Sequence, residues 1–352
     1  MRLAGELALD RHAAPWSLGP EDWFCEVERL RTLIARLAGA DPDGVAIVPA
    51  TSYGLAVAAA NIQAAGGDRV VLLAGDFPSN VHTWTAWAER GGAEVLTVER
   101  SEGQGWTEPL LDSLDERVRV VSIPSVHWTD GSVVDLQRVA GRAREIGSLL
   151  VVDATQSLGA VPLDLAAVQP DYLVAAGYKW LLGPLGTSYL YVAPDHRDGR
   201  PLEENWANRT GAEDFEAATP IASGYRPGAR RFDAGQRSNF VLVPMAIAAL
   251  EQVLDWGVDG IAAALGSITH RIEEGTRARG LGPLPARLRG PHMLGIRLPA
   301  ARATGLAERL AEGNVHVEVL GSVMRVSPHL HTTEEDLGRL FEALDDLVED
   351  NE

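Results

Sequence analysis

The sequence predicts an α/β protein with a mainly parallel sheet covered by helices on both faces, followed by a smaller α/β domain. Short apolar segments of strand length alternate with helical segments between residues 45 and 192, which is the pattern of a parallel sheet. The 352 residues also exceed the roughly 250 to 300 residues over which one core usually grows. We therefore expect a large domain over residues 16–250, and a small domain over residues 251–352 together with residues 1–15.

The first expected element is a helix over residues 20–38. Pro20 suits the first turn of a helix, and Leu30, Leu33 and Leu37 recur at helical spacing. Alternating strands and helices follow, and sheets built in this way bind ligands at the C-terminal ends of their strands. The expected strands are 45–48, 70–74, 94–98, 118–123, 149–152, 172–175 and 187–192, with helices at 54–65, 81–90 and 136–146.

The segment 197–237 is expected to be irregular, because it is rich in Pro, Gly, Arg and Trp. Ordered loops of this length are usually functional or belong to an interface. Thr332 and Glu335 have the spacing of a capping box for the last helix. The expected elements after residue 237 are helices at 242–256, 261–279, 303–311 and 334–348, and strands at 293–297, 315–319 and 323–326.

The acidic composition excludes several classes of partner. Asp and Glu number 49 against 31 Lys and Arg, so a nucleic-acid partner, whose phosphates require a basic surface, is not expected. No apolar run reaches the ~18 residues needed to cross a bilayer, and residues 1–10 carry acids where a signal peptide would be apolar. We therefore expect a cytoplasmic protein without membrane contact. Any anionic ligand must be held by helix N-termini and individual arginines.

Cysteine and histidine give little support to a metal site. Cys25 is the single cysteine, which rules out an intrachain disulfide and a cysteine-rich metal site. We expect Cys25 in a helical core position, because free cysteines are among the most buried residues. Zinc remains a rival hypothesis without HExxH or CxxC spacing to support it, and its candidate ligands are His127, His292, His316, His329 and His331.

Lys179 is the only lysine, since the other 30 of the 31 basic residues are arginines. A guanidinium group stays protonated, whereas a desolvated lysine amine can lose its proton and form a Schiff base with a carbonyl. Asp153 follows the expected strand 149–152 and precedes Lys179 by 26 positions. Such an acid either caps the next turn or pairs with a heteroaromatic nitrogen. An amine and a buried carboxylate together are what pyridoxal 5′-phosphate (PLP) requires.

Three motifs resemble those of one enzyme group. Asp-Ala-Thr-Gln at residues 153–156, Gly-Tyr-Lys at 177–179 and the later Arg325 are similar to motifs of class V aminotransferases and cysteine desulfurases, which are fold-type I PLP enzymes. The resemblance covers roughly residues 20–350. It implies a large PLP-binding domain with a mainly parallel, seven-stranded sheet and a smaller C-terminal α/β domain. It also implies a homodimer with active sites at the interface.

The resemblance gives individual residues their expected roles. Lys179 would form the Schiff base, Asp153 would pair with the ring nitrogen, and Gln156 would bind the ring oxygen. Phe77 falls where the group places an aromatic ring or His over the pyridine ring, although core packing would also suit it. Relatives often carry an Asn near the ring oxygen, and here the segment 125–128 offers Trp128 or the preceding His127 instead.

The expected phosphate and carboxylate contacts come from four segments. Thr51 and Ser52 match a strand-to-helix turn that holds the phosphate, and hydroxyls at a helix N-terminus favour an anion in any case. Tyr178 stands where many desulfurases have a His, so its hydroxyl is an expected phosphate donor. Arg237 lies in a loop that resembles the one crossing the dimer interface, where a cofactor phosphate would explain an arginine. Arg325 matches the arginine that binds the substrate α-carboxylate.

The sequence predicts the reaction less narrowly than it predicts the cofactor. Lys179, once displaced by the substrate amine, is the natural base for the Cα proton. A cysteine desulfurase needs a thiol on the loop before Arg325, and residues 312–323 contain none. Transamination is the first choice because it needs only Lys179, Asp153 and a carboxylate-binding arginine. A PLP-dependent β-lyase (C–S lyase) or an amino-acid epimerase or racemase is the alternative, and a non-catalytic PLP carrier is disfavoured.

Overall fold

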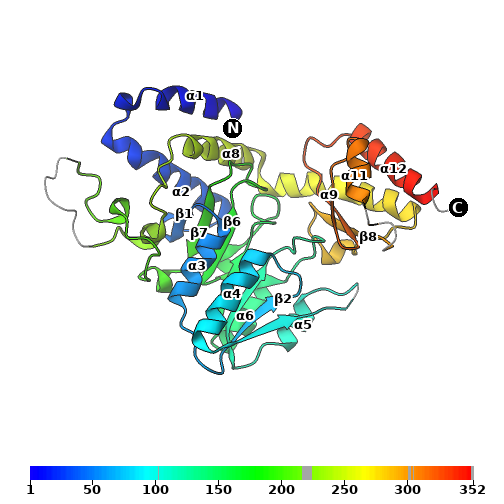
Figure 1. Ribbon diagram of the computed structural model, residues 1–352, viewed down its shortest axis with the longest axis horizontal. Helices are drawn as coiled ribbons and strands as arrows, with labels where there is room; N and C mark the ends of the chain where they lie inside the picture. Colours follow the sequence, from blue (N-terminus) through cyan, green and yellow to red (C-terminus); the bar gives the residue numbers. More distant parts are fainter. Residues whose placement is uncertain (102, 216–223, 300–302, 304, 350–352) are drawn as a thin grey trace.

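The computed structural model describes residues 1–101, 103–215, 224–299, 303 and 305–349, and these form two sheets with helices packed around them (Figure 1). The larger sheet has the order β1-β7-β6-β5-β4-β2-β3, and β7 runs against its neighbours while the other pairs are parallel. This arrangement confirms the predicted α/β fold with a mainly parallel, seven-stranded sheet. Its strands are β1 (Val45–Val48), β2 (Arg69–Leu73), β3 (Glu94–Val98), β4 (Val118–Pro124), β5 (Leu149–Asp153), β6 (Tyr172–Ala176) and β7 (Ser188–Val192).

Helices cover both faces of the large sheet, which explains why most side chains of its central strands are apolar and buried. One core lies against α2, α6 and α8, and a second core lies on the other face against α3 and α4. The helices of this part are α1 (Arg2–His12), α2 (Cys25–Ala38), α3 (Thr51–Asn61), α4 (Pro78–Gly91), α5 (Thr107–Asp112), α6 (Leu136–Glu145), α7 (Leu165–Val168) and α8 (Leu242–Trp256).

Close packing of α3 on the sheet fixes the position of its N-terminus. Gly54 allows this approach, because a Cβ at that position would lie 2.7 Å from Cγ1 of Val174 on β6. The rest of α3 is rich in alanine, so the helix can lie flat on the strands. Thr51, the first residue of α3, is thereby held at the C-terminal end of β1.

The second sheet is small and antiparallel, with the order β8-β10-β9. It lies to one side of the large domain, and the 21-residue α9 runs toward it from α8 (Figure 1). None of the described helices, α9 included, is long and apolar enough to cross a membrane. The elements of this part are α9 (Val258–Ala278), β8 (Leu294–Arg297), α11 (Leu306–Glu312), β9 (Glu318–Leu320), β10 (Val323–Val326) and α12 (Glu334–Glu349).

The expected domain division at residue 250 falls inside α8. Helix α1 runs along α8, and Gly5 of α1 is packed against Met245 of α8 (Figure 1). This contact differs from the expectation that residues 1–15 accompany the small domain. We propose instead that α1 belongs to the large domain and that the division falls at Gly257, which separates α8 from α9.

Two local expectations were wrong. Cys25 is exposed at the first residue of α2, because the buried face of this helix runs through Val27, Leu30 and Ile34 and leaves Cys25 to one side. The capping box of α12 is formed by Thr333 and Asp336, one residue later than expected. The Thr333 hydroxyl accepts from the Asp336 N–H at 3.3 Å, and the Thr333 N–H donates to the Asp336 carboxylate at 2.8 Å. The helix begins at residue 334, so its N-cap is residue 333.

Candidate active site

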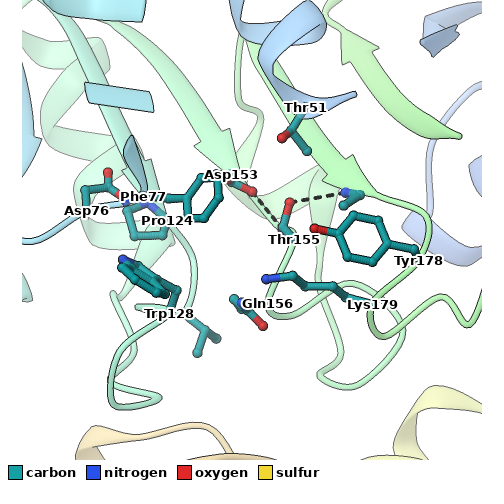
Figure 2. Close-up of a pocket in the computed structure, with 12 residues that line it drawn as sticks. Thr51, Asp76, Phe77, Pro124, Trp128, Asp153, Thr155, Gln156, Tyr178 and Lys179 are labelled. Atoms are coloured by element: carbon teal, nitrogen blue, oxygen red, sulfur yellow. Dashed lines mark hydrogen bonds between the residues drawn. The ribbon is translucent and has the colours of Figure 1, made fainter. Parts of the chain in front are cut away.

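A cavity with about 400 Å³ of empty space opens at the C-terminal edge of the large sheet (Figure 2). Its walls come from the ends of β1, β2, β4, β5 and β6 and the segments that follow them, which is where sheets of this kind bind ligands. The lining residues are Thr51, Asp76, Phe77, Pro124, Val126, Trp128, Asp153, Thr155, Gln156, Ala176, Tyr178 and Lys179. Residues from five separate segments of the chain are therefore brought to one place.

Seven of the ten residues expected at the site line this cavity, and three do not. Those that line it are Thr51, Phe77, Trp128, Asp153, Gln156, Tyr178 and Lys179. Ser52 is exposed beside Thr51 and is not part of the lining. Arg237 is also outside the lining. Arg325 adjoins the cavity from the small domain, because its Nη1 donates to the main-chain oxygen of Trp128 at 2.7 Å.

Lys179 projects into the cavity from the loop after β6 (Figure 2). Gly177 lets this loop lie against the start of β7, since a Cβ there would be 2.6 Å from the main-chain oxygen of Thr187. Nζ of Lys179 lies 5.8 Å from the centre of the Phe77 ring. Burial lowers the pKa of Lys179, and the positive charge of Arg325 lowers it further. The amine can therefore lose its proton more readily than an exposed lysine, as a nucleophile or base requires.

Asp153 ends β5 and lies buried on the floor of the cavity. Its Oδ1 accepts a hydrogen bond from the main-chain N–H of Thr155 at 2.9 Å. The Thr155 hydroxyl accepts from the N–H of Ala176 at 3.1 Å, so this turn is tied to the end of β6 (Figure 2). Burial raises the pKa of Asp153, while the bonds from Thr155 and the charge of Lys179 lower it. A cationic N–H partner in the cavity would favour the ionised form.

Gln156 is held at both its side chain and its main chain. Nε1 of Trp180 donates to Oε1 of Gln156 at 3.2 Å. Nε2 of His292 lies 2.6 Å from the main-chain oxygen of Gln156, and this carbonyl can only accept, so Nε2 carries the proton. Burial lowers the pKa of His292 to about 4, which keeps the ring neutral at pH 7.

Phe77 and Trp128 form the apolar wall of the cavity. Their rings meet edge to face with centroids 5.6 Å apart, and Nε1 of Trp128 donates to the main-chain oxygen of Gly75 at 2.8 Å. His127 lies behind this wall, stacked on Trp106 with centroids 5.2 Å apart. Its Nδ1 contacts the Thr129 hydroxyl at 2.8 Å. Of the two candidates in this segment, Trp128 faces the cavity, and His127 is engaged elsewhere.

The N-terminus of α3 offers the cavity an anion site. The first main-chain N–H groups of a helix have no partner within it, and they carry the positive end of its dipole. The Thr51 side chain lines the cavity at this point, and Tyr178 lies across from it with 45% of its surface exposed (Figure 2). Two hydroxyls and a helix N-terminus are thus available to a phosphate group.

Arg237 is buried among groups of its own chain. Its guanidinium lies against Asp233, with Nε 3.0 Å from Oδ2, and Nη2 donates to the main-chain oxygen of Ala207 at 3.1 Å. Asp233 also binds Arg31 and the N–H of Ile47. Arg237 is thus part of a structural ion cluster, and the prediction that it contacts the cofactor phosphate receives no support from this position.

Arg325 is oriented by two acceptors. Besides the main-chain oxygen of Trp128, its guanidinium binds Glu318, which stands directly opposite on the neighbouring strand β9. The guanidinium carbon lies 5.9 Å from the centre of the Trp128 ring. These contacts hold the positive charge of Arg325 at the edge of the cavity, close enough to lower the pKa of Lys179.

Asp76 is a lining residue that the sequence reasoning missed. Its carboxylate accepts from the N–H of Phe77 at 2.6 Å and from Nδ2 of Asn80 at 2.7 Å. Burial, together with the charge of Asp153, raises the pKa of Asp76 to about 7 despite these two bonds. Part of the signal was present in the sequence, because Asp76 also follows an apolar strand, although it comes three positions after the end of β2 whereas Asp153 is the last residue of β5.

The histidines do not form a metal site. No group of three or more His, Cys, Asp or Glu side chains is arranged to hold a metal ion within the described ranges. His329 and His331 instead stack on each other, with ring centroids 5.9 Å apart, and His329 stacks on Trp180 at 5.8 Å.

The side chains of the cavity fit the chemistry of PLP. The cofactor needs an amine for its aldehyde, an anion for its ring nitrogen and an anion site for its phosphate. Lys179 supplies a half-buried amine with a lowered pKa, and Asp153 supplies a buried carboxylate. Thr51, Tyr178 and the N-terminus of α3 supply the anion site.

Comparisons with known proteins place the chain in a family. Residues 22–340 match the family described as aminotransferase class-V. An uncharacterized aminotransferase of Bacillus subtilis, YcbU, is 32% identical over 89% of this chain and 81% of its own. Isopenicillin N epimerase of Streptomyces clavuligerus is 26% identical over 90% of this chain and 83% of its own.

A solved structure is similar over nearly the whole chain. C-DES, in a form with glycine linked to the PLP cofactor, superimposes with a TM-score of 0.87 at 20% identity, covering 98% of this chain and 93% of its own. At this identity the likeness concerns the fold, which it confirms as fold type I. The family match and the B. subtilis relative go further, and together with the cavity they show that the chain belongs to the class V aminotransferase family of PLP-dependent enzymes.

Proposed function

We propose that the protein is an aminotransferase that acts on an amino acid bound by Arg325, with Lys179 as the proton carrier. The observation that carries the proposal is the placement of the half-buried Lys179 amine between Asp153 on the cavity floor and Arg325 at its edge. The name of the B. subtilis relative is in keeping with this reaction.

Each of three residues at the cavity has a separate role in this proposal. Bound PLP supplies an electron sink that stabilises negative charge at the substrate Cα. Asp153 would hold its carboxylate against the ring nitrogen and favour the protonated ring. Arg325 would bind the substrate carboxylate and so orient the Cα–H bond. Nζ of Lys179 would accept the Cα proton, while PLP would supply the carbonyl group that takes up the amino nitrogen and water would supply the oxygen of the keto acid.

The apolar wall of Phe77 and Trp128 favours an amino acid with a partly apolar side chain. Both rings lie beside the path from Arg325 to Lys179, since Trp128 contacts Arg325 and Phe77 lies 5.8 Å from Nζ of Lys179. Such a wall also reduces water access during proton transfer, and so limits loss of the proton to solvent.

Cysteine desulfuration is the reaction that the chain is least equipped to perform. It requires a thiol that can take sulfur from the substrate. Cys25 is the only cysteine of the sequence, and it lies on α2 outside the residues that line the cavity. The proposal therefore does not include persulfide chemistry.

Epimerisation is the second candidate, and C–S lysis shares its first steps. An epimerase needs a second group to deliver a proton to Cα. Asp76 lines the cavity and has a pKa of about 7, so a second proton carrier is at hand near neutral pH. Isopenicillin N epimerase is also among the relatives.

Product analysis separates the three reactions. The purified protein, loaded with PLP, is incubated with single amino acids and a 2-keto acid. Transamination gives the keto acid of the donor and a new amino acid in equal amounts. A C–S lyase gives a sulfur leaving group such as a thiol together with pyruvate and ammonia, and an epimerase gives the inverted amino acid without needing an acceptor. Release of either of the last two product sets, without amino transfer, would replace the aminotransferase proposal.

A further inference from the structure

The orientation of the Gln156 amide is determined by Trp180. An indole N–H can only donate, so the end of the amide that meets Nε1 of Trp180 must be its oxygen, and the two atoms lie 3.2 Å apart. The amide nitrogen, which can only donate, is therefore left for the cavity. Figure 2 shows this nitrogen on the side of Gln156 that faces Lys179.

We propose that Trp180 is a positioning residue, whose indole N–H keeps the amide nitrogen of Gln156 directed at the ring oxygen of PLP. The inference rests on the proposed role of Gln156 as a cofactor ligand. If the side-chain amide of Gln156 were flipped, its oxygen and nitrogen would exchange places. The amide oxygen would then face the ring oxygen of PLP, and two hydrogen-bond acceptors repel each other. If the Gln156 amide nitrogen is already held in this orientation, the side chain does not need to rearrange when the cofactor binds.

Trp180 is itself rigidly held. It is 8% exposed and packs in an apolar cluster with Val253 and Leu265. Its ring lies edge to face on His292, with centroids 4.5 Å apart, and stacks on His329 at 5.8 Å. The residue next to Lys179 in the chain is thereby fixed from two sides by the small domain.

His292 completes the arrangement from the segment before β8. Its Nε2–H donates to the main-chain oxygen of Gln156 at 2.6 Å, while Trp180 holds the side chain. Gln156 is thus bound at two points, which leaves its amide nitrogen as the free hydrogen-bonding end. The small domain therefore influences the cofactor through Gln156, as well as the substrate through Arg325.

The test removes the indole N–H and keeps an aromatic ring at the position. Trp180→Phe keeps an aromatic ring, and Trp87→Phe is the matched control, because Trp87 is 2% exposed and its Nε1 donates to the main-chain oxygen of Ile62 at 2.7 Å. Visible absorbance of PLP bound to the protein is recorded from pH 5 to 10 without substrate. Loss of a donor leaves more negative charge on the ring oxygen, which favours the protonated form of the nitrogen that joins the cofactor to Lys179.

We expect Trp180→Phe to raise the pH midpoint of the absorbance change by roughly 0.5 to 1 unit, and Trp87→Phe to leave it in place. Gln156→Ala should raise the midpoint at least as much. Trp180→Phe added to Gln156→Ala should then have no further effect, since both changes remove the same contact. Additive shifts, or an unchanged midpoint in Trp180→Phe or Gln156→Ala, would overturn the proposal.

A second pair of variants serves if Trp180→Phe does not fold. His292→Leu removes the donor to the main chain of Gln156, whereas His292→Gln keeps a donor near the position of Nε2. The midpoint should rise in His292→Leu and return toward the wild-type value in His292→Gln, and equal midpoints in the two variants would contradict the arrangement. Because no substrate is present, the outcome is independent of whether the protein transfers amino groups.

Discussion

Burial displaces the pKa values of the titratable side chains in the cavity in opposite directions. It raises the pKa of Asp76 and Asp153 and lowers that of Lys179. Each shift favours the neutral form, as expected when charge is moved from water into an apolar wall. A bound cofactor with a ring cation and a phosphate anion would supply the missing opposite charges.

Lys179→Arg should abolish turnover while keeping the positive charge. A guanidinium cannot attack the aldehyde of PLP, so the defect is chemical rather than electrostatic. Borohydride reduction of the wild-type protein followed by peptide mapping should find the cofactor fixed on Lys179. A map without a modified Lys179, or an active arginine variant, would refute the assignment.

Arg325→Ala should raise KM for amino acids by about tenfold or more, because a charge-assisted contact to the carboxylate is worth roughly 1.5–3 kcal/mol. PLP should still bind, because Arg325 is not among the residues that line the cavity. Arg297→Ala is the matched control, since Arg297 is an exposed arginine on β8 of the same sheet. An unchanged KM in Arg325→Ala would remove this residue from carboxylate binding.

Asp76 should make the protein without cofactor less stable as pH rises from about 4 to 7. Its folded-state pKa of about 7 lies above the ordinary value, so the folded state holds a proton that the unfolded chain has lost. The stability of Asp76→Asn relative to wild type should therefore increase with pH across this window, by a few kcal/mol at most. Urea unfolding at several pH values measures the difference. Asp112→Asn, which replaces an exposed carboxylate on α5, is the control for loss of one acidic charge.

Residue types predicted part of the site and gave no signal for another part. Lys179 and Asp153 could be found because a lone lysine and an acid after a buried strand are chemically unusual. Asp76 comes three positions after the end of β2, and no partner in the sequence pointed to it. The role of Arg237 stays a prediction, because a sequence does not reveal which arginine is neutralised in the fold, and Asp233 lies only four positions before it.

At the scale of elements, a buried ion pair ties α2 to the edge of the large sheet. Both side chains of the Arg31–Asp233 pair are fully buried, with Nη2 and Oδ2 2.7 Å apart. Oδ1 of Asp233 also accepts from the N–H of Ile47 on β1 at 2.7 Å. One carboxylate thus joins α2 and β1 to the chain that follows Gly228–Phe232, the short 3₁₀ helix η6.

Arg31→Met should destabilise the protein by about 3–5 kcal/mol, since it leaves Asp233 buried without its main partner. Arg29→Met on the same helix is the control. Arg29 pairs with Glu251 at the surface, and such pairs contribute about 1 kcal/mol or less. If urea unfolding gave equal decreases in the free energy of unfolding for the two variants, the buried pair would stabilise the fold no more than the surface pair does.

Two glycines of α9 should respond to alanine in opposite ways. A Cβ at Gly275 would lie 2.2 Å from the ring of Phe341 on α12, whereas nothing lies within 4 Å of one at Gly260. Gly275→Ala should therefore destabilise the small domain by about 1–3 kcal/mol, and Gly260→Ala should be neutral or stabilise it by up to about 1 kcal/mol. Thermal unfolding compares them, and loss of stability in both would argue against this packing of α9 on α12.

Strand positions could be predicted within one to three residues because each strand is a short apolar run between polar turns. The short helices α5 and α7 could not, since six and four residues are too few to show a period. Helix α1 escaped notice because its leucines do not form a buried stripe: Leu3, Leu7 and Leu9 are all more than half exposed.

At the scale of the whole molecule, the site depends on contacts that the sequence does not reveal. Arg325 reaches the main chain of Trp128 across 197 positions, and His292 reaches Gln156 across 136. Family resemblance predicted that Arg325 belongs to the site, but no local pattern predicted His292. Spatial order in the sheet, which places β1 beside β7, is likewise absent from the order of the chain.

A homodimer remains a prediction for the molecule as a whole. Light scattering of the PLP-loaded protein should give a mass near twice the 37.7 kDa of one chain. The dimer should persist on dilution to micromolar concentration if the interface has the size of a stable one. A single species of 37.7 kDa would count against it.

The lone lysine in the cavity also makes the protein a simple target for protein chemistry. Apart from the α-amino group of the chain, Nζ of Lys179 is the only aliphatic amine available to acylating or reductively alkylating reagents. Its modification can therefore be read from the mass of the intact chain, without digestion. Protection by PLP against one added acyl group would report occupancy of the cavity, and the rate of acylation against pH would titrate this single amine directly.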